Sequence, residues 1–120
     1  MDTRTVAAEF TRLCKEGKAD EAGARFWSDK VVSIEAMDGP MARCNGLKEV
    51  QAKGEWWYAN HDVHSFETEG PYVNGDQFAL QFKIDVTPKN GEMAGKRMQM
   101  TEVGLYTVKD GKVVEERFFY

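Results

Sequence analysis

The sequence predicts a single α+β domain, residues 1–120, in which a curved antiparallel sheet wraps around three N-terminal helices. Apolar residues recur at helical spacing in the first half of the chain, and after His61 they alternate as in strands. Asn-Gly turns separate several of these strands, as hairpins require. We therefore expect the order α-α-β-α-β-β-β-β, with long strands that twist into a cone with an open end and an internal pocket.

The first half of the chain contains the helix signals. The predicted elements are helices over residues 6–14, 20–27 and 47–60 and one strand over residues 31–36. Gly17 follows the first helix where a helix should end, and Gly46 precedes the third. The turn Asp38-Gly39-Pro40 closes the early strand. These punctuating residues set the boundaries of the helical half.

The second half of the chain is predicted to be strand throughout. The predicted strands cover residues 63–73, 78–87, 97–108 and 113–120. In the second of them the apolar residues occupy alternate positions and share one face: Phe78, Leu80, Phe82, Ile84 and Val86. That face is therefore the core face, and the helices are expected to pack on it.

The final hairpin places Glu102 and Glu116 on neighbouring strands. If Lys109-Asp110-Gly111 is a three-residue loop, Gly104 faces Glu116, and both glutamates lie on the pocket side. If the loop has two residues, the pairing shifts by one and Glu115 joins Glu102 instead. We favour the three-residue loop.

The composition excludes several classes of protein. The net charge of −4 comes from intermixed acids and bases, without the basic stripe that a nucleic-acid partner would need. No apolar run is long enough for a membrane span, and the polar N-terminus offers no secretory signal, so we expect a cytoplasmic protein. Cys14 and Cys44 are too few for a disulfide framework and are expected to be buried and inert.

The landmarks of the chain resemble the nuclear-transport-factor-like superfamily of cystatin-like cones, and within it the SnoaL-like and ketosteroid-isomerase-like branch. The resemblance rests on the helix-Gly17-helix-strand opening, on Gly46, and on the ending from Tyr106 to Tyr120 with its Asp-Gly-Lys hairpin. It covers nearly the whole chain. Because this superfamily holds isomerases, dehydratases, polyketide cyclases, epoxide hydrolases and binding modules, the resemblance implies the fold but no single reaction.

Ketosteroid isomerases of this fold use a helix-one tyrosine, an aspartate base on the first strand and a protonated aspartic acid on the penultimate strand. The resemblance places Phe10 at the tyrosine and Gly104 at the protonated acid. The base position falls within residues 34–37, where Glu35 is the only carboxylate. Two of the three groups are missing, which disfavours a steroid isomerase with that machinery.

Glu102 and Glu116 are the candidate acid–base pair. Two carboxylates in one apolar pocket cannot both ionise cheaply, so one should hold its proton while the other acts as the base. His64 shares the parity of Phe66 and is a candidate proton shuttle, and the alternative that we favour is a half-exposed histidine at the start of a strand. Tyr120 is expected to help orient the substrate. The expected function is an isomerase- or cyclase-type enzyme that acts on a small hydrophobic carbonyl compound. The alternative is a non-catalytic module that binds a small ligand.

The candidate ligand-binding residues are mostly aromatic or sulfur-containing: Trp27, Glu35, Trp56, Phe82, Met98, Met100, Phe118 and Tyr120. Adjacent Trp56 and Trp57 are not both expected to point inward, so one of them roofs the cavity or meets a partner chain.

Two further chemistries are disfavoured. An epoxide hydrolase would need an Asp-Arg-Asp arrangement, which Asp85, Arg97 and Glu102 imitate only loosely because Asp85 should face outward. His61 and His64 are three residues apart on a strand and should point to opposite faces, so no metal site is predicted. No cofactor is predicted either.

The outer face of the sheet is mixed and partly apolar, which is typical of an interface between two copies of a chain. Its predicted members are Gln81, Lys83, Gln99, Thr101, Val103, Leu105 and Thr107. Resemblance to the superfamily implies the same back-to-back homodimer.

Overall fold

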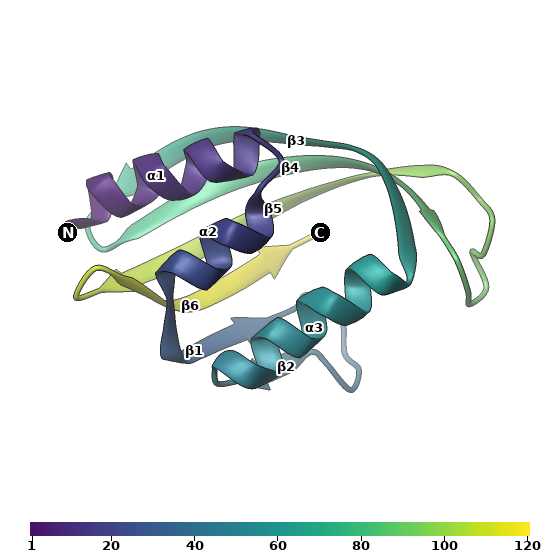
Figure 1. Ribbon diagram of the computed structural model, residues 1–120, viewed down its shortest axis with the longest axis horizontal. Helices are drawn as coiled ribbons and strands as arrows, with labels where there is room; N and C mark the ends of the chain where they lie inside the picture. Colours follow the sequence, from purple (N-terminus) through teal and green to yellow (C-terminus); the bar gives the residue numbers. More distant parts are fainter.

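The computed structural model describes residues 1–120 and contains three helices and six strands (Figure 1). The helices are α1 (Thr3–Lys15), α2 (Ala19–Phe26) and α3 (Leu47–Ala59). The strands are β1 (Trp27–Ile34), β2 (Arg43–Asn45), β3 (His61–Asn74), β4 (Gln77–Pro88), β5 (Met98–Lys109) and β6 (Lys112–Phe119). The predicted α+β class is confirmed. The three-residue strand β2 was not predicted, because it is too short to show any alternation.

The six strands form one sheet in the order β2-β1-β6-β5-β4-β3. All neighbouring strands are antiparallel except β1 and β6, which run parallel. The expectation of a wholly antiparallel sheet is therefore wrong at this one pair. The parallel pair arises from the path of the chain. After the edge strands β1 and β2, the chain crosses through α3 to the opposite edge strand β3. Three hairpins then lead back across the sheet and place β6 beside β1.

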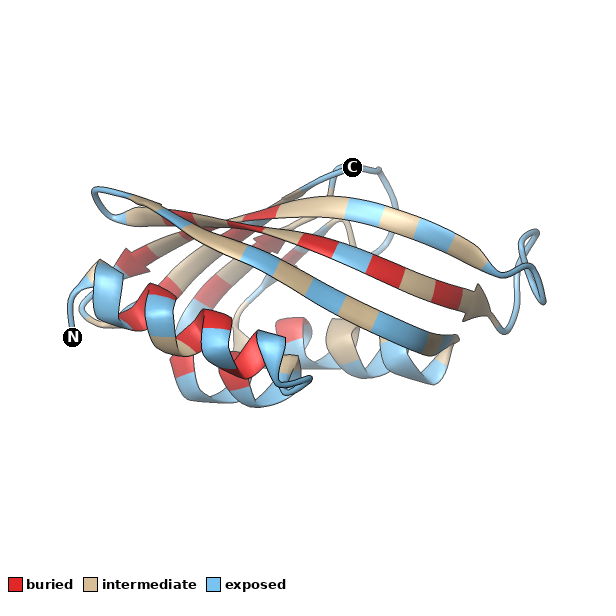
Figure 2. Cartoon of the chain, turned by 90° about the horizontal axis from the view of Figure 1, so that it is seen from above, coloured by how far each residue is buried: buried red, intermediate tan, exposed pale blue.

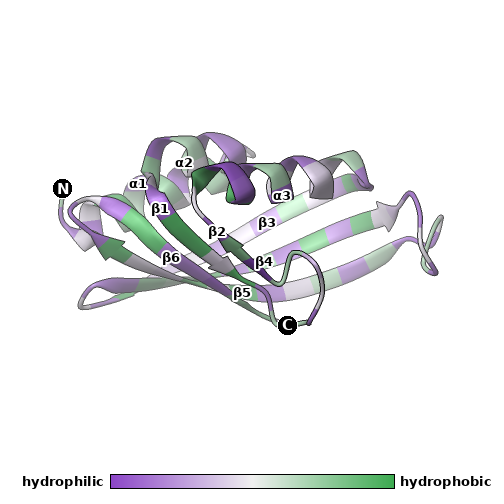
Figure 3. Cartoon of the chain, turned by 90° about the horizontal axis from the view of Figure 1, so that it is seen from below, coloured by the Kyte–Doolittle hydropathy of each residue, from purple (hydrophilic) through white to green (hydrophobic).

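All three helices lie on one face of the curved sheet (Figure 2). The predicted alternation of β4 is confirmed, because its apolar residues from Phe78 to Val86 are buried while their neighbours are not. Helix α1 covers this strand and β3 with a stripe that includes Val6, Phe10 and Leu13. On the strands β1 and β6, hydrophobic bands lie beneath the helices (Figure 3). Cys14 and Cys44 are buried and free, as expected.

The β5–β6 hairpin differs from the prediction in its register. The loop has two residues, Asp110 and Gly111, with φ angles of 52° and 77°, so Lys109 faces Lys112. An Asp-Gly pair suits this turn because both central positions need positive φ. The favoured three-residue loop and the expected facing of Gly104 and Glu116 are therefore wrong.

A bulge nevertheless keeps Glu116 on the inner face. The register shifts between Thr107 and Val108, so that Thr107 faces Glu115 and Tyr106 faces Glu116. The extra residue in β6 cancels the change of parity that a two-residue loop would cause. As a result, Glu116 is buried and faces Tyr106.

None of the helices has the length and apolar character needed to cross a membrane.

Candidate functional site

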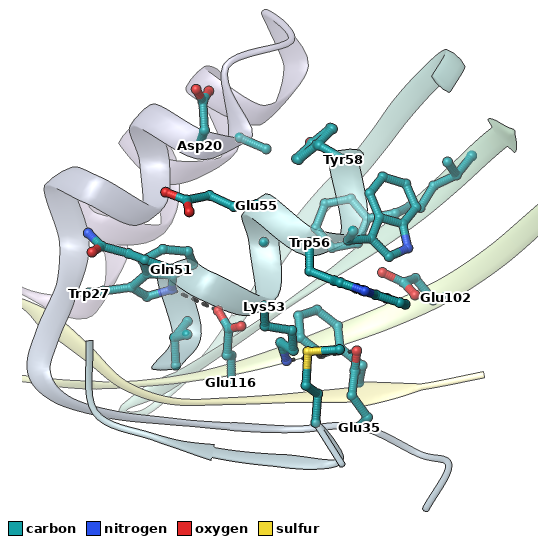
Figure 4. A pocket seen from close by; sticks show the side chains of 18 of the residues that line it. Asp20, Trp27, Glu35, Gln51, Lys53, Glu55, Trp56, Tyr58, Glu102 and Glu116 are labelled. Atoms are coloured by element: carbon teal, nitrogen blue, oxygen red, sulfur yellow. Dashed lines mark hydrogen bonds and ion pairs between the residues drawn. The ribbon is translucent and has the colours of Figure 1, made fainter. Parts of the chain in front are cut away.

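A large cavity opens between α2, α3 and the inner face of the sheet (Figure 4). Its volume is about 1180 Å³, and most of the residues around it are hydrophobic. The residues proposed from the sequence that line it are Trp27, Glu35, Trp56, Phe82, Glu102, Glu116, Phe118 and Tyr120. The structure thus brings together side chains from both ends of the chain.

Glu116 is fixed by two hydrogen bonds at the floor of the cavity, and Figure 4 shows the one from Trp27. Trp27 Nε1 donates to Oε1 at 2.8 Å, and the Ser33 hydroxyl donates to Oε2 at 2.7 Å. Burial raises the pKa of Glu116, while the two donors act in the opposite direction. The parallel pairing explains the contact, because Ser33 and Glu116 are register partners in β1 and β6.

Trp27 reaches Glu116 because its ring lies against a glycine. It is the first residue of β1, directly after α2, and its ring covers Gly23 of that helix. A Cβ at Gly23 would lie 2.5 Å from the nearest ring carbon. Only a residue without a side chain therefore leaves room for the indole in this position.

Lys53 extends the polar chain from α3 and was not identified from the sequence. Its Nζ donates to the Ser33 hydroxyl, lies 3.8 Å from Glu35 Oε1 and sits 5.3 Å from the centre of the Phe118 ring. The resulting series runs from Trp27 through Glu116, Ser33 and Lys53 to Glu35. Its signal in the sequence is the position of Lys53, three residues after Val50 on the stripe of α3 that faces the sheet.

Glu102 differs from Glu116 because its carboxyl group has no hydrogen bond or ion pair with the protein. It is half-buried on the inner face of β5 and lines the cavity. Burial, followed by the negative charge of Glu35, raises the pKa of Glu102 to about 7, and Lys53 offsets part of this effect. Near neutral pH, this carboxyl group is therefore divided between its protonated and ionised forms.

His64 lies outside the cavity, so the candidate role as a proton shuttle that shares the face of Phe66 is wrong, and the side chain is exposed at the start of a strand as in the favoured alternative. The register of β3 and β4 shifts between Val63 and Ser65, which changes the parity at His64. Its side chain is exposed, and its Nε2 lies 2.8 Å from the Thr87 hydroxyl.

Several other expectations about the site need correction. Met98 and Met100 are half-buried against the core but do not line the cavity. Trp56 and Trp57 lie side by side near the C-terminal end of α3 and both line the cavity, so the expectation that they would not both point inward is wrong. Trp57 also stacks on His61, with 4.6 Å between the ring centres.

The three residues that loosely resemble an epoxide-hydrolase site, Asp85, Arg97 and Glu102, do not come together. Asp85 pairs with Arg97, with 2.9 Å between the closest charged atoms, and faces outward as expected. Glu102 lies on the other face of the sheet, where its register partner on β4 is Phe82. No group of three or more His, Cys, Asp or Glu side chains is close enough to hold a metal ion.

Comparison with known proteins identifies the family. The family model described as a SnoaL-like domain matches residues 1–120. The chain belongs to the SnoaL-like family. Comparison with curated proteins gives no match.

Solved structures of SnoaL-like and related proteins share this fold. A proposed SnoaL-like polyketide cyclase from Mesorhizobium loti, also named carbohydrate phosphatase, is 52% identical over 100% of both chains, with a TM-score of 0.95. An NTF2-like protein from Burkholderia thailandensis is 16% identical, with 99% of this chain and 90% of that chain covered and a TM-score of 0.80. A protein of unknown function with a cystatin-like fold from Xanthomonas campestris is 17% identical, with 99% and 90% covered and a TM-score of 0.76.

Within this SnoaL-like cavity, two of the three positions aligned with the ketosteroid-isomerase groups have no polar side chain. Phe10 lines the cavity and lies 4.8 Å from Tyr106 between ring centres. Gly104 has no side chain, and the Tyr106 side chain covers it. On the sheet side of the cavity the carboxylates are Glu35, Glu102 and Glu116, and of these three only Glu102 has no hydrogen bond or ion pair with the protein. Further carboxylates line the cavity from α2, α3 and the loop after β1: Asp20, Glu55 and Asp38.

Proposed function

We propose that this SnoaL-like protein is an acid–base enzyme that moves a proton next to the carbonyl group of a small apolar compound, in an isomerisation or a cyclisation. One observation carries the proposal: the Glu102 carboxyl group opens into the cavity without a partner in the protein, and its pKa is about 7. A general base works best when its pKa lies near the working pH.

Glu116 supports Glu102 without exchanging protons with the substrate. Its two oxygens are occupied by Trp27 and Ser33, so it is held in place at the floor of the cavity. Its charge adds to the effects that raise the pKa of Glu102. In this proposal Glu116 therefore adds, after burial and the charge of Glu35, to the proton affinity of the base.

The walls of the cavity favour an apolar substrate. The aromatic side chains of Trp27, Trp56, Phe82, Phe118 and Tyr120 lie around Glu102 and Glu116. Such walls bind flat hydrocarbon bodies and exclude water from the base. The name of the 52% identical Mesorhizobium loti protein, a proposed polyketide cyclase, supports a cyclisation in the same cavity.

The experiment is exchange of the carbon-bound hydrogens of 2-tetralone for deuterium in heavy water, followed by proton NMR. Wild-type protein should accelerate exchange next to the carbonyl group, and Glu102→Gln should remove the acceleration. Glu115→Gln is the matched control, because Glu115 lies opposite Thr107 and outside the cavity. Exchange at the same rate in wild type and Glu102→Gln would contradict the proposal.

The second candidate function is a non-catalytic module that binds a small ligand. It is favoured by the apolar residues Phe10 and Gly104 at two positions where related isomerases are polar, and by the internal pairing of Lys53 with Glu35. In that case 2-tetralone or a similar ligand would bind and protect the protein from unfolding, but its hydrogens would exchange no faster than in buffer.

We also propose a homodimer through the outer face of the sheet, in the cytoplasm. Val103, Leu105 and Thr107 on that face of β5 are half-buried already in one chain. Together with the polar residues around them they form a broad, partly apolar surface, which suits contact with a second copy of the chain. The two free cysteines are compatible with a reducing compartment.

A further inference from the structure

Tyr106 is a buried tyrosine that lines the cavity, and its hydroxyl group has no hydrogen-bond partner in the protein. Only 3% of the residue is exposed. Its ring stacks on Phe78 at 4.9 Å between centres and packs against Phe10 at 4.8 Å. These contacts fix the ring, so the direction of the hydroxyl group is fixed as well. The hydroxyl oxygen itself is not fully enclosed, because it borders the cavity, where water or a ligand supplies its hydrogen-bond partner.

Gly104 determines where this hydroxyl group lies. A Cβ at Gly104 would be 2.8 Å from the Tyr106 hydroxyl oxygen, so the tyrosine folds back along β5 over the inner face of the glycine. Phe118 is the register partner of Gly104, and its ring meets Tyr106 edge-on, with 6.3 Å between ring centres. The hydroxyl group therefore occupies the space that a side chain at position 104 would take.

Glu102 is the next residue on the same face of the strand. Residues two apart in a strand are about 7 Å apart along it. Because the Tyr106 side chain reaches back over Gly104, its hydroxyl group lies on the side of that residue where Glu102 projects into the cavity. A hydrogen-bond donor and a carboxyl group thus flank one short stretch of the cavity, and each lacks a partner in the protein.

We propose that Tyr106 donates a hydrogen bond to the oxygen atom of the ligand while Glu102 exchanges a proton with the adjacent carbon. The ligand class is a flat, apolar ketone or enone with one acceptor oxygen. The proton step rests on the proposed function, whereas the hydrogen bond from Tyr106 does not depend on it.

The step balances without any other reactant. The carbon–hydrogen bond next to the carbonyl breaks, and its proton joins a carboxylate oxygen of Glu102. The electron pair of that bond forms a carbon–carbon double bond, and the carbonyl oxygen takes the negative charge beside the Tyr106 hydroxyl. Glu102 then returns the proton to the same carbon or to another one.

Tyr106 keeps its own proton in this step. Burial, together with the negative charge of Glu116, raises the pKa of Tyr106 well above its ordinary value. It therefore acts as a donor that stabilises the developing charge, which is the role of an oxyanion-hole group.

The test uses 2-tetralone labelled with carbon-13 at the carbonyl, and the infrared frequency of that carbonyl in the protein. With wild type the frequency should fall, since a hydrogen bond weakens the carbonyl bond. With Tyr106→Phe the fall should be lost. Tyr72→Phe is the matched control, because Tyr72 is exposed and outside the cavity. In the deuterium exchange assay, Tyr106→Phe should slow the reaction about 100-fold, as for removal of one oxyanion donor.

The outcomes separate this inference from the proposed function. Glu102→Gln should abolish exchange but keep the shifted carbonyl frequency. A shift in wild type that Tyr106→Phe removes, without any exchange, would support the role of Tyr106 and contradict the proton step. No shift in wild type, or an equal shift in Tyr106→Phe, would overturn the role of Tyr106. Gly104→Ala, which displaces the hydroxyl instead of deleting it, should also lose the shift and provides a second variant if Tyr106→Phe does not fold.

Discussion

Ser33 on β1 and Glu116 on β6 are register partners in the one parallel pair of the sheet, and the Ser33 hydroxyl donates a 2.7 Å hydrogen bond to the Glu116 carboxyl. The same hydroxyl accepts a hydrogen bond from Lys53. One fully buried side chain therefore connects the floor of the cavity to helix α3.

Ser33→Ala should destabilise the protein, because it leaves Glu116 and Lys53 each without one hydrogen-bond partner. Loss of a buried partner costs about 1–3 kcal/mol. Urea unfolding followed by circular dichroism measures the change in the free energy of unfolding. Ser65→Ala, at an exposed position on β3, is the control and should change little. Equal stability of Ser33→Ala and wild type would show that the chain from Glu116 to Lys53 contributes nothing.

Stability should depend on pH through Glu102. The pKa of Glu102 is about 7 in the folded protein and 4.5 in the absence of the fold. Between these values the folded state binds more protons than the unfolded state, so the free energy of unfolding falls as the pH rises through this window. The loss is at most about 3 kcal/mol, and it ends above the folded pKa.

The measurement for this pH dependence is urea unfolding at several pH values between 4 and 8. Glu102→Gln removes the titrating group and should flatten much of the slope, while Glu115→Gln should keep the wild-type slope. Glu116, whose pKa is also raised by burial, adds a slope of the same sign. If stability rose with pH over this window, the environment assigned to Glu102 would be wrong.

Two glycine substitutions should have opposite effects. Gly23→Ala places a methyl group 2.5 Å from the Trp27 ring and should push the indole away from Glu116, at a cost of about 1–3 kcal/mol. Gly54→Ala lies in α3 with no atom within 4 Å of the added Cβ, so it should stabilise the helix by up to about 1 kcal/mol. Thermal melts compare the two, and a shift in tryptophan emission should accompany Gly23→Ala only.

Leu105→Glu should dissociate the proposed homodimer. It would place a charge in a surface that loses water on association, which costs several kcal/mol when the charge has no partner. Sedimentation velocity at micromolar concentration should show a dimer for wild type and a monomer for this variant. Lys48→Glu, at an exposed position on α3, is the control and should stay dimeric. A wild-type monomer would rule out this interface.

Prediction of the fold depended on local patterns that one strand or one helix carries by itself. The alternation from Phe78 to Val86 and the turns at Gly75 and Gly91 are local, so β3, β4 and β5 were predicted within a few residues. Strand β2 has only three residues and was missed. The parallel pairing of β1 with β6 was also missed, since it joins segments more than eighty residues apart and leaves no pattern in either.

The residues of the candidate site could be predicted from local patterns, but their contacts could not. Glu102 and Glu116 could be proposed from parity and composition, because charged residues on an apolar face are conspicuous in the sequence. The partners of these glutamates could not be predicted from the sequence. A bulge in β6 sets the position of Glu116, and a second bulge, in β3, turns His64 outward.

Hydrophobic periodicity and turn residues act within short segments, so the amino-acid sequence was enough to predict the α+β class, the longer strands and the apolar side of the sheet. Three relationships could be seen only in the folded protein: Trp27 and Ser33 hold Glu116, Glu102 has no partner, and Tyr106 lies over Gly104. Those relationships depend on register, bulges and burial. They arise from packing between distant segments, and packing fixes both the proton affinity of Glu102 and the direction of the Tyr106 hydroxyl.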